Sequence, residues 1–285
     1  MRNKERLSAA HAEDVAALIN SHETKVNNPV EIATPTQLVD LPSKGLFYPA
    51  DHPWHNKESV EIRFMTAKDE DILINKSYIQ KGVVIDKLLS SVLLDKRVNL
   101  DSILLCDKSA LVVAARMTGY GSEYTAEIAC PSCTKNSKFN FNLDLFTNIF
   151  PEDEKLESAE VTLTENLTFS LELPKTKANV EFKLLNGADE KRLTHLAETK
   201  KKQNLPDSSL TDQVKQYVVS INYESDKSYI NKFIDSMPAF DAKFLRRMYN
   251  NVTPSVNNRQ EFNCIHCGES QEVEVPLTVG FFWPE

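Results

Sequence analysis

Two short stretches decide the fold of this chain, and they read Cys130-Pro-Ser-Cys133 and Cys264-Ile-His-Cys267-Gly268. Each stretch places two thiols at a tight turn, so that both sulfur atoms can face one metal ion. Two such knuckles that face each other complete a tetrahedral shell of four sulfur atoms around zinc. The glycine after the second pair suits the positive-φ position that follows such a turn. The sequence therefore predicts one structural Zn²⁺ ion bound by four cysteines: Cys130, Cys133, Cys264 and Cys267.

The two cysteine pairs lie 134 positions apart, whereas ordinary zinc ribbons separate their pairs by about 15–20 residues. The surrounding sequence accounts for this gap, because its pattern indicates an internal duplication in which each copy carries one cysteine pair. Val60–Leu73 matches Val180–Leu193 at a constant offset of 120, and each copy offers an aspartate at a helix start. Asp107 and Asp241 each stand 23 residues before the first cysteine of their pair. The polar stretch Thr199–Thr211 supplies the insertion that the second copy needs.

Each cysteine pair is followed by apolar residues with a period of two, which is typical of a strand. These residues are Phe139, Phe141 and Leu143 in the first copy and Val273, Val275 and Leu277 in the second. We therefore expect an α+β protein of two duplicated modules, each with a strand, two or three helices and a zinc-knuckle hairpin. The shared four-cysteine zinc ribbon joins the modules about a pseudo-two-fold axis.

The same reading divides the chain into four regions. They are an N-terminal helix and extended arm (1–40), module 1 with the first knuckle (41–150), an acidic connection and hairpin (151–174), and module 2 with the second knuckle (175–285). The N-terminal helix is expected at residues 8–21, with Val15, Leu18 and Ile19 on one face. It is either a frayed surface helix or an arm that docks on a partner.

Other uses of the cysteines stay open. Two disulfides or a redox pair are possible, but the N-terminus has no secretory core, so we expect an intracellular chain in which disulfides are disfavoured. A catalytic zinc needs an open position and usually a histidine or carboxylate ligand, and His266 is an alternative ligand. Cys106 lies in an apolar run and is expected to be an ordinary buried core residue.

The composition excludes several classes of protein. The chain has 285 residues, a formal net charge of −8 and only 7 glycines. The acidic balance argues against binding to nucleic-acid phosphates, and no glycine-rich phosphate loop is present. None of the 6 histidines is spaced as a metal pair or as a base for a nucleophile, so we predict no enzyme. No apolar run of about 18 residues occurs, so we expect no membrane span.

Two apolar segments either fill the core of the chain or contact another chain. The first is Leu41–Pro49, in which three large side chains follow a turn around Gly45. The second is the C-terminal segment, where three consecutive aromatic residues would be unusual on a monomer surface. Aromatic residues dominate the centres of protein interfaces. The candidate partner-binding residues are therefore Leu46, Phe47, Tyr48, Phe281, Phe282 and Trp283.

Four segments, in this order, resemble the small baseplate hub and hub-assembly proteins of T4-type phages with contractile tails. The segments are Leu41–Pro49, Val60–Leu73, Leu111–Cys133, and Phe262–Cys267 together with Phe281–Pro284. The resemblance implies a non-enzymatic role in the central baseplate hub, through contacts with other hub proteins. It implies assembly in the host cytoplasm, and it leaves open whether the chain stays in the tail baseplate of the virion or leaves after assembly. The metal site is predicted from this sequence and not from the resemblance.

Two other functions compete with this interpretation. A nucleic-acid-binding zinc ribbon, such as a phage transcription factor, shares the four-cysteine signal, but it needs a basic face. A metalloenzyme needs an open position on the zinc ion.

Overall fold

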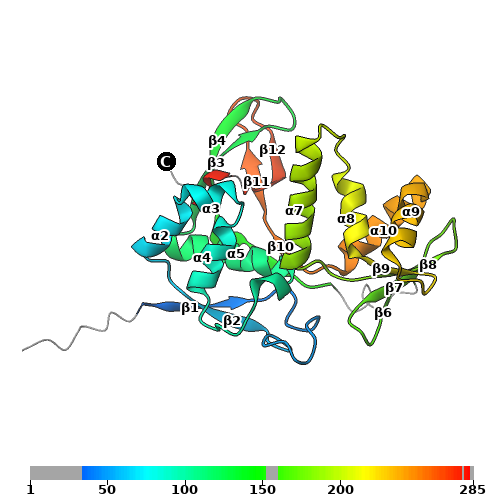
Figure 1. Ribbon diagram of the computed structural model, residues 1–285. Helices are drawn as coiled ribbons and strands as arrows, with labels where there is room; N and C mark the ends of the chain where they lie inside the picture. Colours follow the sequence, from blue (N-terminus) through cyan, green and yellow to red (C-terminus); the bar gives the residue numbers. More distant parts are fainter. Residues whose placement is uncertain (1–33, 152–159, 278, 283–285) are drawn as a thin grey trace, which may run out of the picture. The chain divides into compact units, whose positions relative to one another are not determined.

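A computed structural model describes residues 34–151, 160–277 and 279–282. The chain divides into two units, Met1–Pro35 and Thr36–Glu285, and the second is described below and shown in Figure 1. The expected helix at 8–21, the acidic stretch at 152–157 and Trp283 lie outside the described residues. The prediction of a mixed helix-and-sheet fold is confirmed. Within the described ranges, no helix has the length and apolar character needed to span a bilayer.

The first half of this unit leads from a strand pair through a group of helices to a hairpin. Its elements are β1 (Thr36–Asp40), β2 (Ser59–Arg63), α2 (Ala67–Leu73), α3 (Lys76–Gln80), α4 (Val84–Val92), η1 (Leu100–Ser102), α5 (Leu105–Tyr120), β3 (Glu123–Ala129), β4 (Asn136–Asn142), η2 (Leu143–Leu145) and β5 (Thr147–Ile149).

The second half leads from strands through a second group of helices to a second hairpin. Its elements are β6 (Thr162–Leu163), β7 (Phe169–Glu172), β8 (Asn179–Phe182), α7 (Gly187–Lys202), α8 (Ser209–Tyr217), β9 (Val218–Ile221), α9 (Lys227–Ser236), α10 (Ala239–Val252), β10 (Ser255–Asn257), β11 (Arg259–Asn263), β12 (Ser270–Glu274) and η3 (Val279–Phe282).

The strands pair in small antiparallel sheets. The described pairs are β1–β2, β3–β4, β11–β12 and β10–β5, and a four-stranded sheet has the order β6-β7-β8-β9. The β10–β5 pair joins the two halves, since Ser255 lies opposite Ile149. The buried apolar side chains of both halves form one continuous core.

Two helices of the two halves begin in the same way. At the start of α2, the buried carboxylate of Asp69 accepts hydrogen bonds from the Thr66 N–H (2.8 Å) and from both terminal nitrogens of Arg63 (2.7 and 2.9 Å). This capping box satisfies orphan N–H groups of the first turn and neutralises the carboxylate. The start of α7 uses three equivalent residues: Lys183, Asn186 and Asp189.

These caps predict a loss of stability in acid. Burial alone would raise the pKa of Asp69, but hydrogen bonds from Arg63, Ser91 and Thr66 outweigh it and hold that pKa well below its usual range. The pKa of Asp189 is lowered for the same kind of reason. A lowered pKa contributes stability above the unfolded-state value of about 3.9, and this contribution is lost as the pH falls below it. We expect the free energy of unfolding, measured with urea, to fall between about pH 5 and pH 2.

The matched variant for this measurement is Asp69→Asn with Asp189→Asn. It should be less stable near neutral pH, because it lacks both ion pairs, and its stability should depend less steeply on pH below about 5. An equal pH slope in the variant and the unchanged protein would show that other carboxylates cause the acid effect.

A second pair of aspartates fixes a loop in each half. Asp107, the third residue of α5, accepts hydrogen bonds from the Ser43 N–H (2.9 Å), the Ser43 hydroxyl (2.6 Å) and the Tyr48 hydroxyl (2.7 Å). Asp241, the third residue of α10, accepts from the Thr176 N–H (2.9 Å) and hydroxyl (2.8 Å). Both carboxylates are fully buried. Asp107 therefore ties the loop after β1 to the start of α5, and Asp241 ties the loop after β7 to the start of α10.

The two halves also meet directly through their backbones. The Leu105 N–H donates to the Leu185 carbonyl (3.0 Å), and the Gly187 N–H donates to the Ile103 carbonyl (2.9 Å). A methyl group at Gly187 would lie far inside van der Waals contact with the Leu100 carbonyl oxygen. This close approach of two backbones requires glycine at the first position of α7.

Candidate metal centre

The cysteine pairs lie in the turns of two equivalent hairpins. The first turn connects β3 to β4, and the Thr134 N–H donates to the Cys130 carbonyl (2.8 Å). The second connects β11 to β12, and the Gly268 N–H donates to the Cys264 carbonyl (2.9 Å). Thr134 and Gly268 both have positive φ angles, 60° and 73°. The left-handed residue turns the chain so that both thiols of a pair point to the same side.

The structure brings the four sulfur atoms of the two pairs together. All four lie within 4.8 Å of one another. The Cys130 and Cys267 sulfurs are 3.8 Å apart, and the Cys133 and Cys264 sulfurs are 3.7 Å apart. A tetrahedral ion with metal–sulfur bonds of about 2.3 Å separates its ligands by roughly 3.8 Å. The cluster therefore has the dimensions of a four-thiolate metal site and can hold a metal ion.

These distances also bear on the other uses of the cysteines. A disulfide needs sulfur atoms about 2.05 Å apart, and all five cysteines of the chain are free. Cys130 and Cys264 are buried, whereas Cys267 is exposed. An ion can therefore reach the cluster from one side. Cys106 is buried in the core and lies away from the four-cysteine cluster, as its apolar surroundings in the sequence predict.

Backbone donors around Cys264 favour the thiolate form of this residue. The His266 N–H lies 3.4 Å from the Cys264 sulfur. Burial raises the pKa of Cys264, but this hydrogen bond and one from the Cys267 N–H outweigh it and lower the pKa to about 6. Across the cluster, the Gln271 side-chain amide donates to the Cys130 sulfur (3.7 Å). Such donors orient ligand sulfurs and stabilise their negative charge.

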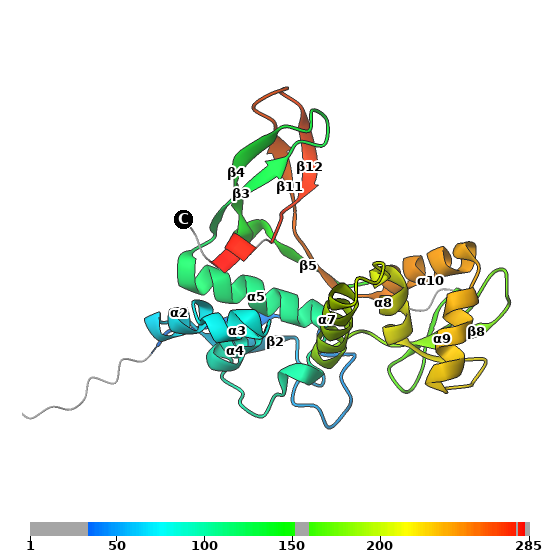
Figure 2. The ribbon, with the colours of Figure 1, turned by 45° about the horizontal axis from the view of Figure 1, so that its top comes forward.

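Two side chains link the hairpins, one beside the cysteine turns and one at the far end of β4, and Figure 2 shows the hairpins side by side. The Gln260 side chain donates to the Asn142 carbonyl (2.6 Å) and accepts from the Asn142 N–H (3.1 Å). His266 Nε2 lies 3.2 Å from the Asn136 carbonyl oxygen. The His266 ring is thus engaged outside the four-sulfur group, which favours a shell of cysteines alone.

Most of the candidate partner-binding residues lie in the core of the chain itself. Phe47 and Tyr48 are 7% and 1% exposed. Phe281 and Phe282 are each 3% exposed. Leu46 is different, because 45% of its surface is exposed. Burial favours the core alternative for the four aromatic residues, and partner contact by Leu46 stays a prediction.

The C-terminal segment is fixed by contacts with α5 and β3. The Phe281 ring packs edge-on against Tyr124, with 5.1 Å between the ring centroids. The buried guanidinium of Arg116 donates to the Phe281 carbonyl (2.6 Å). The described part of this C-terminal segment therefore packs on the first half of the chain, beside the β3–β4 hairpin that carries the first knuckle.

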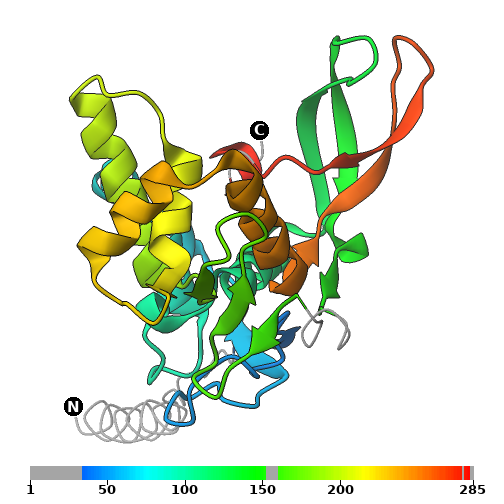
Figure 3. The ribbon, with the colours of Figure 1, turned by 90° about the vertical axis from the view of Figure 1, so that its right-hand side faces the viewer.

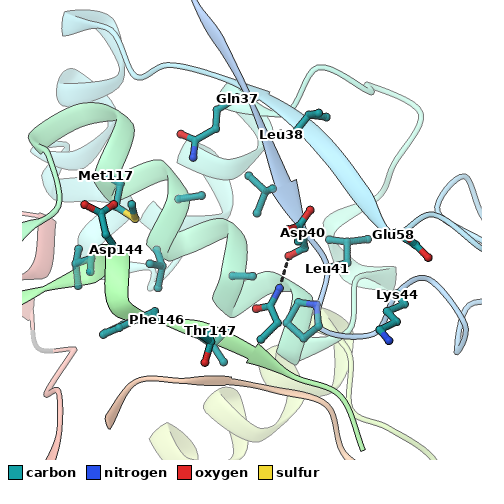
Figure 4. Close-up of a pocket in the computed structure, with 18 of the residues that line it drawn as sticks. Gln37, Leu38, Asp40, Leu41, Lys44, Glu58, Met117, Asp144, Phe146 and Thr147 are labelled. Atoms are coloured by element: carbon teal, nitrogen blue, oxygen red, sulfur yellow. Dashed lines mark hydrogen bonds between the residues drawn. The ribbon is translucent and has the colours of Figure 1, made fainter. Parts of the chain in front are cut away.

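A groove of about 700 Å³ between β1, α5 and β5 was not predicted from the sequence (Figure 4). Its lining includes the apolar side chains of Leu41, Met117 and Phe146, and the Asn148 side chain closes one end by donating to the Asp40 carbonyl (2.8 Å). No histidine, cysteine or serine is among the residues that line it. The groove offers apolar contact area and no nucleophile with a base. No local signal reveals it, because its walls come from segments about 100 residues apart.

Comparison with known protein families gives a match over most of the chain. The model of the family described as "T4 bacteriophage base plate protein" matches residues 41–283. No curated protein and no solved structure matches the chain.

Proposed function

Because this chain belongs to the family of T4 bacteriophage base plate proteins, we propose that it is a component or assembly factor of the central baseplate hub. The family match over residues 41–283 supports a structural role in the baseplate. The assignment to the hub rests on the order of the four sequence segments described above. The chain acts without catalysis, through contacts with other hub proteins. It assembles in the host cytoplasm and takes its place in the tail of the virion.

We further propose that the cluster holds one structural Zn²⁺ ion. Two observations support zinc. The donor set consists of four cysteine sulfurs, which is typical of closed structural zinc sites. The sulfur separations of 3.7 and 3.8 Å match a tetrahedral ion of that size. Neither pair alone supplies a full shell, so binding of the ion couples the two hairpins.

The proposal includes a duplication, with module 1 at 41–150, module 2 at 175–285 and a connection at 151–174. Four pairs of equivalent features support it: the two knuckles, the two capping boxes, the two loop-fixing aspartates and the helices that carry them. The strand pairs β1–β2 and β7–β8 are also equivalent, so we propose to move the start of module 1 back to β1 and the start of module 2 back to β7.

A null mutation tests the function. In the phage that encodes this chain, an amber codon early in the gene is expected to stop tail assembly at the hub. Lysates of a non-suppressing host should contain filled heads and few baseplates, and growth in a suppressing host should restore infectious particles. Electron microscopy of both lysates and plaque counts check this. Normal baseplates and infectious tails without the protein would refute the proposal.

A further inference from the structure

The start of α7 docks on a segment of module 1, and the corresponding segment of module 2 has no partner among the described residues. In module 1, the segment Ile103–Leu105 receives the start of α7 through the two backbone hydrogen bonds described above. By the offset of 134, the same segment in module 2 is Met237–Ala239. By the offset of 120, the segment of module 1 that is equivalent to the start of α7 is Met65–Ala67. Figure 1 shows α2 and α10 on opposite sides of the second unit.

The free segment has the same backbone geometry as the occupied one. The residue before α5 is Leu104, with φ −62° and ψ 143°, and the residue before α10 is Pro238, with φ −54° and ψ 138°. The Ile103 N–H donates to the Leu100 carbonyl and the Met237 N–H to the Ile234 carbonyl, both at 3.3 Å. The backbone of Met237–Ala239, an edge of module 2, therefore already has the conformation that Ile103–Leu105 adopts when it binds the start of α7. Figure 3 shows α9 leading into α10 through this edge.

The surface of this edge is exposed. Pro238 and Ala239 are exposed, and Phe240 is 58% exposed, whereas its equivalent Cys106 is buried. Among the described residues, the Ala239 N–H and the Met237 carbonyl have no hydrogen-bond partner. In module 1 the equivalent N–H and carbonyl groups both bind the start of α7.

We propose that the Met237–Phe240 edge docks the helix start of a related module carried by another baseplate protein. This inference rests on the duplication proposed above. The partner must present a strand end followed by glycine at the first helical position, as Gly187 does, because the receiving carbonyl leaves no space for a methyl group.

Charge complementarity adds a second requirement on the partner. In the internal contact, Lys191 at the fifth position of α7 pairs with Asp101 at 2.5 Å. The equivalent of Asp101 on the free edge is Asp235, which pairs with Lys215 and still keeps 58% of its side chain exposed. A partner with lysine at the fifth helical position would form the same ion pair with Asp235.

A second copy of this chain meets neither requirement. Its α2 begins with Ala67, whose methyl group would strike the Ile234 carbonyl in the equivalent contact. Its fifth helical residue is Asp71, which would face Asp235 with the same charge. Head-to-tail contacts of this type build open filaments when nothing prevents them. Ala67 and Asp71 therefore prevent a second copy from binding this edge, which leaves the edge accessible to a different protein.

The test gives a second copy the features of the proposed partner. The variant Ala67→Gly with Asp71→Lys copies the start of α7 onto the start of α2, and both positions are exposed. We expect it to self-associate in a concentration-dependent way in sedimentation velocity, while the unchanged protein does not do so through this edge. Failure to associate above the level of the unchanged protein would overturn the docking proposal, and the zinc and baseplate proposals would be unaffected.

A further substitution shows which surface associates. Ala239→Pro removes the N–H that donates to the partner, yet proline is favoured at a first helical position. The extended backbone of Pro238 suits a following proline. Added to the double variant, it should weaken association about tenfold or more, because a buried carbonyl loses its donor. Association that persists unchanged would place the contact elsewhere and refute the docking edge.

Discussion

Replacing Cys130 with serine is expected to remove the metal from the purified protein, which should otherwise carry about one zinc ion per chain. Cys130 is buried and lies 3.8 Å from Cys267 of the other hairpin, so its loss breaks the shell between the two modules. Three remaining sulfurs leave a coordination position open, and zinc affinity should fall by more than about a hundredfold. The metal content of dialysed protein, measured by plasma mass spectrometry, checks this.

The matched control is Cys106→Ser. Cys106 is also buried, but it lies in α5 beside Asp107 and outside the four-sulfur group. This variant should keep its zinc. A chelator should lower the unfolding temperature of the unchanged protein and of the control, and it should have little effect on Cys130→Ser. Equal zinc content in the two variants would refute the shared metal site.

Replacing Gly45 with alanine is expected to be the most destabilising single methyl addition among the described glycines. Gly45 has φ 72° and lies in the loop that Asp107 fixes. A methyl group there would lie 2.5 Å from the Trp54 carbonyl oxygen and 2.6 Å from the Lys57 carbonyl oxygen, and neither backbone atom can rotate away. Backbone strain and overpacking together should cost at least about 3 kcal/mol of the free energy of unfolding.

Gly82→Ala separates the two causes. Gly82 also has a positive φ, 66°, but no atom lies within 4 Å of an added methyl group. This variant should lose about 1 kcal/mol from backbone strain alone. Urea denaturation of both variants measures the difference. If both lose the same amount, the close approach of the Leu41–Tyr48 loop to Trp54 and Lys57 does not contribute to stability.

The features that the sequence predicted correctly depend on local patterns. The cysteine pairs lie in tight hairpin turns, and Gly268 has the positive φ expected of it. Asp69 and Asp189 cap helices, as their position after an alternating strand predicts. Each of these interactions spans a few residues, so the residue types and their spacing determine it.

The features that the sequence did not predict depend on contacts between distant segments. The sequence left open whether Phe281 fills the core, and its position is set by Arg116 and Tyr124, more than 150 residues earlier in the chain. The meeting of Leu105 with Leu185 likewise depends on packing of whole helices. Gly187 at the start of a helix was the available signal, because glycine at such a position indicates a close backbone approach.

The distance along the chain between the two knuckles has a consequence for folding. Cys130 and Cys267 are 137 residues apart, so a metal ion that binds both would close a long loop of chain in a partly unfolded state. In the chain-entropy treatment of cross-links, closing a loop of this size lowers the entropy of the unfolded ensemble and raises its free energy by roughly 5 kcal/mol. At about 5–20 residues per second, synthesis of the second knuckle follows that of the first by roughly 7–27 s. The full four-sulfur shell of the proposed zinc site can therefore form only after the second knuckle has been synthesised.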